Sequence, residues 1–338
     1  MNNVSMVFRA AALLLLAHAA MANAAVTGKR SPLGFSLSGG LGTIHGGDLN
    51  RMIADWHAVI AGPDYEALSP TIEWADFQGV STLGAEVFYH LSTRFAVSLG
   101  FEVLKKHIQG EITFTGGPGT DEWNDNYYFY HVEYRDESAF KPENSLSAIP
   151  VILNAYCFVT GGRPLRAFVK AGVGYYFASL KSTYQETTTY HYRTDRYDWP
   201  GGALSDVYRD ESTTATTFVD RAKCGALGFH AGAGFEFDVT SSMTLLIEGM
   251  HRTADLGRWK GTGSVAHRSY RSYGWQSEGY QQDEEAWTYS YPGDLCYLLI
   301  DKGPRVMINN DEWGLGDVRP ALIKLGGFSF RVGFKIRF

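Results

Sequence analysis

The first residues to test for chemistry are two histidine–serine pairs, His90-Leu-Ser92 and His267-Arg-Ser269. A nucleophilic hydroxyl needs a base held within hydrogen-bond reach, so such a pair works only where the fold brings both side chains together. The first pair falls at an expected short turn, and the second falls in a long region without an expected strand. The sequence has neither a Cys/His metal spacing nor a glycine-rich phosphate loop. We therefore expect no enzyme, no metal and no cofactor.

Charged residues at alternate positions of apolar segments form the second chemical group. If these segments are strands, the charges share one face and the apolar residues share the other. Carboxylates and cations in a narrow lumen predict a cross-linked network that plugs the lumen, because unpaired charges there would be costly. A selective polar channel or a proton path is the alternative. Parity and depth place Arg331 near Glu248 and make Lys335 available to Glu86 or Glu102. The predicted network consists of Glu86, Glu102, Lys170, Glu236, Glu248, Arg331, Lys335 and Arg337.

The last eleven residues are the segment that best defines these two faces. Apolar residues at every second position alternate with small or cationic ones. That pattern is expected of a strand in an outer-membrane barrel, apolar toward lipid and polar toward the lumen. A final Phe preceded by such alternation also resembles the signal by which bacterial outer-membrane proteins are handed to their assembly machinery. The residues of this signal are Phe328, Phe330, Val332, Phe334, Ile336 and Phe338.

The start of the chain predicts export. An apolar run too short to span a bilayer follows Arg9 and leads to the Ala22-Asn23-Ala24 cleavage pattern. We read residues 1–24 as a removed signal peptide and residues 25–338 as one domain. The formal net charge of the chain is −6, which gives no indication of nucleic acid as a partner. The 20 Tyr, 20 Phe and 8 Trp suit the aromatic girdles of a barrel.

Eight alternating segments can be counted after the signal. Short turns and long polar regions strictly alternate between them, as short periplasmic turns and long extracellular loops do in outer-membrane barrels. This arrangement predicts an all-β fold, an eight-stranded antiparallel transmembrane β-barrel with periplasmic termini. One helix is expected at residues 48–60, with Asp48 as its cap. The expected strands are 33–43, 83–91, 95–115, 148–158, 166–184, 227–238, 243–254 and 328–338. The expected long extracellular regions are 44–80, 116–146, 185–224 and 255–320.

Three segments carry a resemblance to a known group of proteins. They are residues 149–158 followed by Arg163-Pro164, residues 169–177, and residues 229–237. They look like the fourth, fifth and sixth strands of small outer-membrane barrels of the OmpW and OmpA-like type. The resemblance implies an eight-stranded barrel that serves as a passive channel for small hydrophobic molecules, as a structural protein or as an adhesin.

The outer regions hold the remaining indications of function. Tyr and Trp mix with acidic and small polar residues in residues 127–134, 184–197 and 270–291, which suits recognition of an extracellular protein or glycan. We therefore expect a structural or surface-binding protein of the bacterial outer membrane, surrounded by outer-membrane lipid and lipopolysaccharide. An OmpW-like channel is the first alternative. An outer-membrane lipid-modifying hydrolase is the second, because lipid A deacylases carry a His-x-Ser pair. Whether Cys224 and Cys296 form a disulfide stays open.

Overall fold

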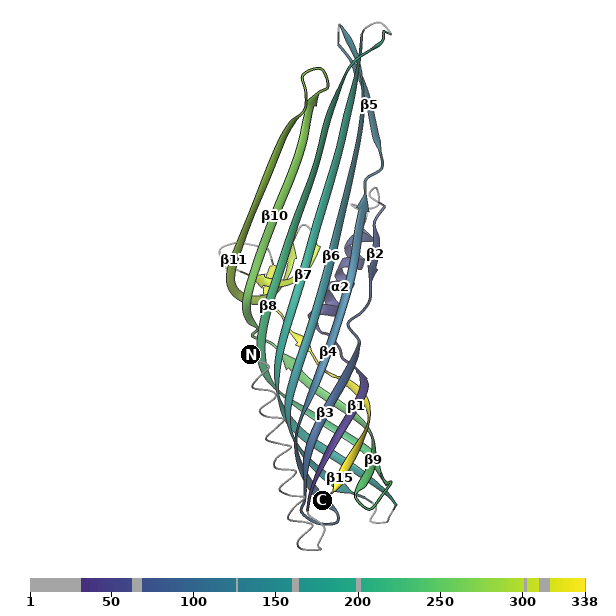
Figure 1. Cartoon of the computed structure of the whole chain (residues 1–338), viewed down its shortest axis with the longest axis vertical. Helices are drawn as coiled ribbons and strands as arrows, with labels where there is room; N and C mark the ends of the chain where they lie inside the picture. The colour runs from purple at the N-terminus through teal and green to yellow at the C-terminus, as the bar shows by residue number, and fades with distance from the viewer. Residues whose placement is uncertain are drawn as a thin grey trace.

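The computed structural model describes residues 32–62, 69–125, 127–159, 164–198, 202–300, 303–309 and 317–337. The molecule is elongated, and its strands run along its length (Figure 1). The described residues form fifteen strands, mostly in one antiparallel sheet, and one helix. The prediction of an all-β antiparallel fold is therefore confirmed. In the described part of the chain, no helix is long and apolar enough to cross a membrane.

Eight of the strands pair in a closed circuit, which we call the ring. Each pairs with the next ring strand along the chain, and the first strand pairs with the last. All of these pairs are antiparallel. In order, the ring contains β1 (Leu33–Thr43), β3 (Gly79–His90), β4 (Phe95–Thr115), β6 (Tyr128–Phe158), β7 (Leu165–Asp198), β8 (Leu204–Asp238), β9 (Met243–Leu256) and β15 (Gly327–Arg337).

The ring closes where β1 meets β15. Nine residue pairs join the two strands, from Gly34 opposite Arg337 to Gly42 opposite Ser329. Gly40 lies against the Phe330 carbonyl so closely that a Cβ there would collide with it. A glycine is needed at this position for the two backbones to approach.

The four regions expected to be long loops are mostly not loops, and this corrects the sequence prediction. Residues 128–147, 185–198 and 204–226 continue β6, β7 and β8 without interruption, so these strands reach 31, 34 and 35 residues. Thr and Tyr, which favour strands, make up half of the extension in β7. Residues 255–320 add four strands, β10 (Lys260–Trp275), β11 (Gln281–Ile300), β12 (Gly303–Asn309) and β13 (Asp317–Pro320).

These extensions form an open sheet above the ring, which we call the upper sheet (Figure 1). It consists of β5 (Gly119–Asn124) and of residues 128–140, 184–198, 204–219, 260–275 and 281–293. The strand order across it is β5, β6, β7, β8, β10, β11. A further short strand, β2 (Thr71–Trp74), pairs with β4 beside it. The upper sheet therefore has edges, unlike the ring.

A helix and three short strands lie where the ring opens into the upper sheet. The helix α2 (Asp48–Ile60) has the bounds that the sequence predicted. The predicted cap is wrong, because Gly47, with φ 59°, is the residue that precedes the helix, and Asp48 is already helical. The Asp48 carboxylate instead accepts hydrogen bonds from Arg319 at 2.6 Å and from the Leu322 N–H at 2.7 Å. The three strands, which we call the strap, are β12, β13 (Asp317–Pro320) and β14 (Ile323–Lys324).

The main hydrophobic core lies between the helix, the strap and the inner face of the surrounding strands. Leu49, Met52 and Trp56 of α2 are almost fully buried, and so are Val306 and Ile308 of β12. The strap is tied to β7 by a hydrogen bond, because the Tyr184 hydroxyl donates to the Val306 carbonyl at 2.6 Å. The core therefore closes the upper mouth of the ring. Cys224 packs against this core and is not in a disulfide, so no bridge joins it to Cys296.

Replacing Gly303 with Ala should loosen the strap. Gly303 has φ 103°, and a Cβ there would enter the space of the Trp56 ring. Backbone strain of about 1 kcal/mol and overpacking of about 1–3 kcal/mol should both lower the free energy of unfolding, which urea titration in detergent measures. Gly279→Ala is the matched control, since Gly279 has φ 86° and nothing within 4 Å. Equal losses in the two variants would show that Gly303 does not pack on Trp56.

Candidate functional site

The interior of the ring is lined by charged side chains from alternate strand positions. Their neighbours in sequence point outward, so the inner and outer faces differ completely in chemistry. Eight ionisable residues on the inner face, four carboxylates and four cations, are at most 8% exposed. They are Glu86, Glu102, Glu236, Glu248, Lys170, Arg252, Arg331 and Lys335.

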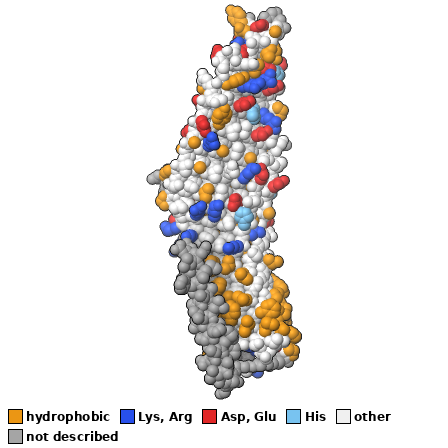
Figure 2. All heavy atoms as spheres, in the orientation of Figure 1, with side chains coloured by type: hydrophobic (Ala, Val, Ile, Leu, Met, Phe, Trp, Pro, Cys, Tyr) orange, Lys and Arg blue, Asp and Glu red, His pale blue; other side chains and the backbone are white. Residues whose placement is uncertain are grey.

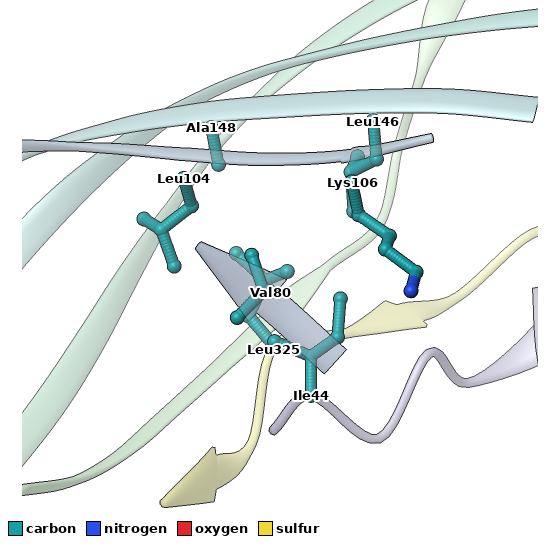
Figure 3. Close-up of a pocket in the computed structure, with 7 residues that line it drawn as sticks. All are labelled: Ile44, Val80, Leu104, Lys106, Leu146, Ala148 and Leu325. Atoms are coloured by element: carbon teal, nitrogen blue, oxygen red, sulfur yellow. The ribbon is translucent and has the colours of Figure 1, made fainter. Parts of the chain in front are cut away.

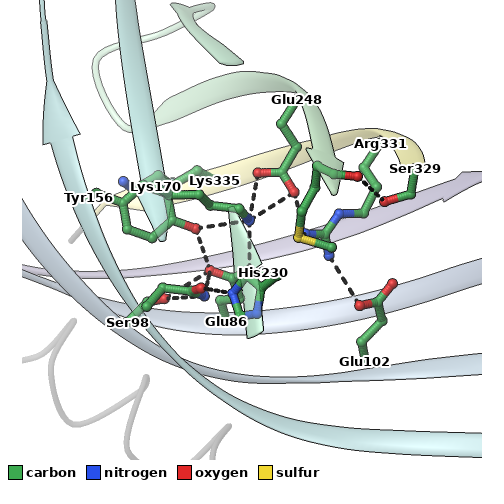
Figure 4. Close-up of polar contacts among 12 residues, drawn as sticks. Glu86, Ser98, Glu102, Tyr156, Lys170, His230, Glu248, Ser329, Arg331 and Lys335 are labelled. Atoms are coloured by element: carbon green, nitrogen blue, oxygen red, sulfur yellow. Dashed lines mark hydrogen bonds and ion pairs between the residues drawn. The ribbon is translucent and has the colours of Figure 1, made fainter. Parts of the chain in front are cut away.

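Glu248 is the centre of the network (Figure 4). It lies directly opposite Arg331 in the pairing of β9 with β15, and their side chains meet at 2.5 Å. On its other side, Lys170 of β7 reaches it at 2.8 Å. Lys170 also lies 3.7 Å from Glu86. Glu248 of β9 thus joins cations from β15 and β7, and Lys170 extends the network to Glu86 of β3.

Neutral groups complete the hydrogen bonds of Glu86. Its carboxylate accepts from the Tyr156 hydroxyl at 2.7 Å and from the Ser98 hydroxyl at 2.9 Å. Asn154 donates to Ser98 and contacts His230 over Gly172, which lies between them on β7. These contacts satisfy lone pairs that an ion pair alone would leave exposed to a low-dielectric interior.

Above this cluster, Glu102 pairs with Arg252. The guanidinium donates two hydrogen bonds to the carboxylate, at 3.0 and 3.2 Å, which is the bidentate geometry of a strong pair. Arg331 approaches the same carboxylate at 3.6 Å. The network predicted from the sequence did not include Arg252. Its parity with Glu248 on β9 was the signal that could have identified it.

Below the cluster, Glu236 collects three cations. Lys335 reaches it at 2.9 Å and Arg337 at 3.1 Å, and Arg166 makes a third ion pair. The expected partners of Lys335 were Glu86 or Glu102, so that expectation was wrong. Lys335 comes late in β15, near the C-terminal end, and therefore lies at the depth of Glu236. Arg166, which shares the parity of Lys170, was also missed.

Together these groups fill the lumen with paired charges. Aromatic rings, including Phe88, Phe158 and Phe168, occupy the space around the lower pairs. The Lys335 ammonium lies 3.9 Å from the centre of the Phe88 ring, a cation–π contact. Such an arrangement cross-links strands on opposite sides of the ring. Among the residues that the structure describes, no group of three or more His, Cys, Asp or Glu could hold a metal ion.

The proposed assembly signal lies on the outer face of β15. Phe328, Phe330, Val332, Phe334 and Ile336 are all exposed, while the intervening Arg331 and Lys335 are buried. The final Phe338 and the cleavage residues Ala22 and Ala24 lie outside the described residues.

The two histidine–serine pairs have other contacts. His90 stacks on Phe158 near the lower end of the ring, and Ser92 accepts hydrogen bonds from the turn backbone. His267 in β10 stacks on Trp287 with ring centres 5.0 Å apart and contacts the Thr216 hydroxyl at 3.0 Å. Neither arrangement shows a histidine bonded to its serine.

A small recess lies between residues of β3, β4 and β6, beside Leu325, which follows β14 (Figure 3). Its empty volume is about 180 Å³. Part of this volume is open to solvent, and the lining side chains leave no room for a water molecule, so the recess is no vestibule. It is lined by Ile44, Val80, Leu104, Lys106, Leu146, Ala148 and Leu325.

One buried carboxylate lies above the recess, beyond the apolar part of the outer face. Asp220 of β8 is 1% exposed, and neither of its oxygens makes a hydrogen bond in the described part of the chain. Burial raises the pKa of Asp220 to about 8. The Ile308 amide, which is close but short of hydrogen-bonding geometry, and the Arg305 guanidinium lower the pKa only in part. Asp220 is therefore protonated at neutral pH, and the strap packs beside it.

The inner face of the upper sheet is aromatic and charged. The Arg196 guanidinium lies between the Tyr128 and Trp275 rings, at 4.7 and 4.6 Å from their centres. Arg271 of β10 pairs with Asp210 of β8 at 2.6 Å. These rigid rings and fixed charges are suited to binding a polar partner from solvent.

No protein-family model and no curated protein matches this sequence. Three solved structures of outer-membrane proteins are similar in part, at low scores. The outer membrane protease OmpT from Escherichia coli is 9% identical, with 92% of this chain and 98% of that chain covered and a TM-score of 0.31. CarO from Acinetobacter baumannii is 12% identical, with 76% and 92% covered and a TM-score of 0.23. A major outer membrane protein from Thermus thermophilus is 11% identical, with 90% and 99% covered and a TM-score of 0.21.

Breaking the central pair should destabilise the ring. Glu248→Gln leaves Arg331 and Lys170 short of a counter-charge and should lower the free energy of unfolding by about 3–5 kcal/mol. The double variant Glu248→Gln with Arg331→Met should recover part of that loss, because it removes one of the stranded cations. Urea unfolding in detergent gives the coupling energy from the two single variants and the double variant. Purely additive effects would mean that the two side chains do not interact.

Asp220 should make stability depend on pH. An acid whose pKa is raised on folding binds its proton more tightly in the folded state, so stability falls as the pH rises from about 4 toward 8. Asp220→Asn should remove this decline and stabilise the protein by about 1–4 kcal/mol at pH 8 relative to pH 5, at about 1.4 kcal/mol per pKa unit. Unfolding between pH 5 and 8 measures it, with the exposed Asp198→Asn as control. An unchanged slope in Asp220→Asn would contradict the buried acid.

Proposed function

We propose that this protein is an integral outer-membrane protein whose ring is a closed, eight-stranded transmembrane barrel and whose upper sheet binds partners at the cell surface. The observation that carries the proposal is the division of the outer face. Apolar side chains cover the ring, and charged and polar side chains cover the upper sheet (Figure 2). A soluble protein would not expose the first surface, and a bilayer would not accommodate the second.

The apolar surface suits contact with lipid. Leu83, Leu227 and Phe229 are all more than 60% exposed, and they come from strands on different sides of the ring, β3 and β8. Tyr175 and Phe177 of β7 lie toward the upper end of this surface and pack against each other, which suits an aromatic girdle. Outer-membrane lipid, with lipopolysaccharide in the outer leaflet, is the expected surrounding.

The orientation follows from the two ends of the ring. The turns at residues 91–94 and 239–242 are short and lie at the same end as the C-terminal part of β15, which we place in the periplasm. The upper sheet then projects from the cell. The C-terminal strand would be handed to the barrel assembly machinery.

A channel function has less support than surface binding. Paired charges occupy the lumen, the helix and strap close its upper mouth, and the recess beneath them is small. An OmpW-like passage would need an apolar vestibule and an exit between strands. A lipid-modifying hydrolase would need a histidine bonded to its nucleophile.

Three hairpins can be shortened to test the role of the upper sheet. Each cut joins two cross-strand partners through an Asn-Gly turn, which keeps the register below it. The partners are Thr115 with Glu137, Thr189 with Thr213, and Ser269 with Glu285. The intact protein and the shortened variant should both be silent in planar bilayers, because the plug lies below the cuts. On arrays of glycans and peptides, only the intact protein should bind. Ion conductance by either protein, or equal binding by both, would overturn the proposal.

Protease added to intact cells should report the orientation. The tip of the β10–β11 hairpin, residues 277–280, is exposed, so a cleavage site inserted there should be cut without permeabilising the cells. The same site inserted at residues 92–94 should be protected until the outer membrane is opened. The opposite result would place the upper sheet in the periplasm.

A further inference from the structure

The upper sheet has a long open edge. From Gln281 to Gly293, β11 pairs with β10 on one side, and no described strand pairs with its other side. Beyond this stretch the same strand is paired on both sides, with β12 and with β13. The edge strand lies at the margin of the molecule in Figure 1. Unpaired N–H and C=O groups along such an edge are a template for an added strand.

The edge is acidic at its upper end. Asp283, Glu284 and Glu285 are consecutive and exposed, and residues 281–291 contain no Lys or Arg. Arg268 pairs with Glu284 at 2.7 Å, but the ion pairs of the described residues include none for Asp283 or Glu285. Arg271, which is opposite Asp283 in the sheet, is engaged by Asp210. Two carboxylates beside the open backbone therefore remain available.

The edge is aromatic just below these acids. Trp287 is 45% exposed and Tyr289 is 46% exposed. Both lie on the same face of the sheet, where Trp287 is held by its stacking on His267. Fixed aromatic rings of this kind can receive apolar side chains of a partner at a low cost in conformational entropy.

The charge argues against a second copy of this chain as the occupant. Pairing two β11 edges would bring two sets of three acids into one sheet. Pairing β11 with the opposite edge, β5, would add Asp121 and Glu122 to the same side. Like charges close together across strands are destabilising. The complementary partner is cationic.

We propose that the open edge of β11 binds an extended cationic peptide, which joins the upper sheet as an additional strand. Backbone hydrogen bonds along the edge supply affinity. Lys or Arg side chains near Asp283 and Glu285, and an apolar side chain against Trp287, supply selectivity. This inference rests on the proposed surface-binding function and names the partner class and the place where it binds.

A synthetic probe tests the proposal directly. The probe is a fluorescein-labelled nonapeptide, Lys-Thr-Lys-Thr-Val-Thr-Val-Thr-Val, in which Lys and Val share one face. It is titrated into the full chain in detergent. Binding should be saturable and should weaken about three- to tenfold with Asp283→Asn plus Glu285→Gln. The matched control, Glu133→Gln plus Glu211→Gln, removes equal charge from strands that are paired on both sides and should bind as the unchanged protein does.

Two further peptides separate strand addition from simple attraction. A probe with N-methyl groups at alternate residues keeps its charge but cannot complete the edge hydrogen bonds, so its binding should be lost. A probe with Glu in place of Lys should not bind. Retained binding of the N-methylated probe, or equal binding to the Asp283 and Glu285 variant, would overturn the inference. If no cationic probe binds while the arrays still show binding that the shortened variant loses, the proposed function stands and this inference falls.

Discussion

The closure of the ring between β1 and β15 is the constraint on which the rest of the structure depends. In hydrocarbon, every backbone N–H and C=O group needs a partner within the protein, and an open sheet edge there costs several kcal/mol for each unsatisfied group. The strands that begin and end the described chain satisfy one another along nine residue pairs. Closure also fixes the inner and outer faces of all eight strands at once, because a slip of one residue would exchange them.

A closed ring of this size creates the second constraint, which is the chemistry of its interior. Small and polar residues alternate with the lipid-facing ones, so charged side chains inevitably meet in a narrow space. Glu248 shows how the conflict is resolved, since Arg331 and Lys170 approach it from different strands. The pairs stabilise the ring only because each charge has a partner, and removal of one leaves another buried alone. The charge network is therefore a consequence of closure, and in the proposed function it also blocks flow through the lumen.

The sequence predicted the parts of the fold that depend on alternation. Period-two patterns located the ring strands and the inner parity of Glu86, Glu102 and Glu248, and helical spacing located α2. Alternation could not show that Lys335 meets Glu236, because partner choice depends on relative strand depth. Nor could it show the long extensions of β6 and β7. Both faces of these extensions carry polar and aromatic residues, so the extensions have no alternating apolar pattern. A strand of this composition resembles a loop in the sequence.

The same difference in solvent explains why the ring has no edges and the upper sheet has them. In the proposed orientation the upper sheet lies in water, which can satisfy unpaired backbone groups. Closure is then no longer required, and the strands can diverge around the helix and the strap. What limits an open edge in water is association with other strands, and charge along the edge restricts which strands can pair with it. Three acids lie beside Trp287 and Tyr289, so the edge of β11 repels the same edge of a second copy. The edge remains complementary to a strand of opposite charge. The open edge is thus compatible with solubility and selective for one class of partner.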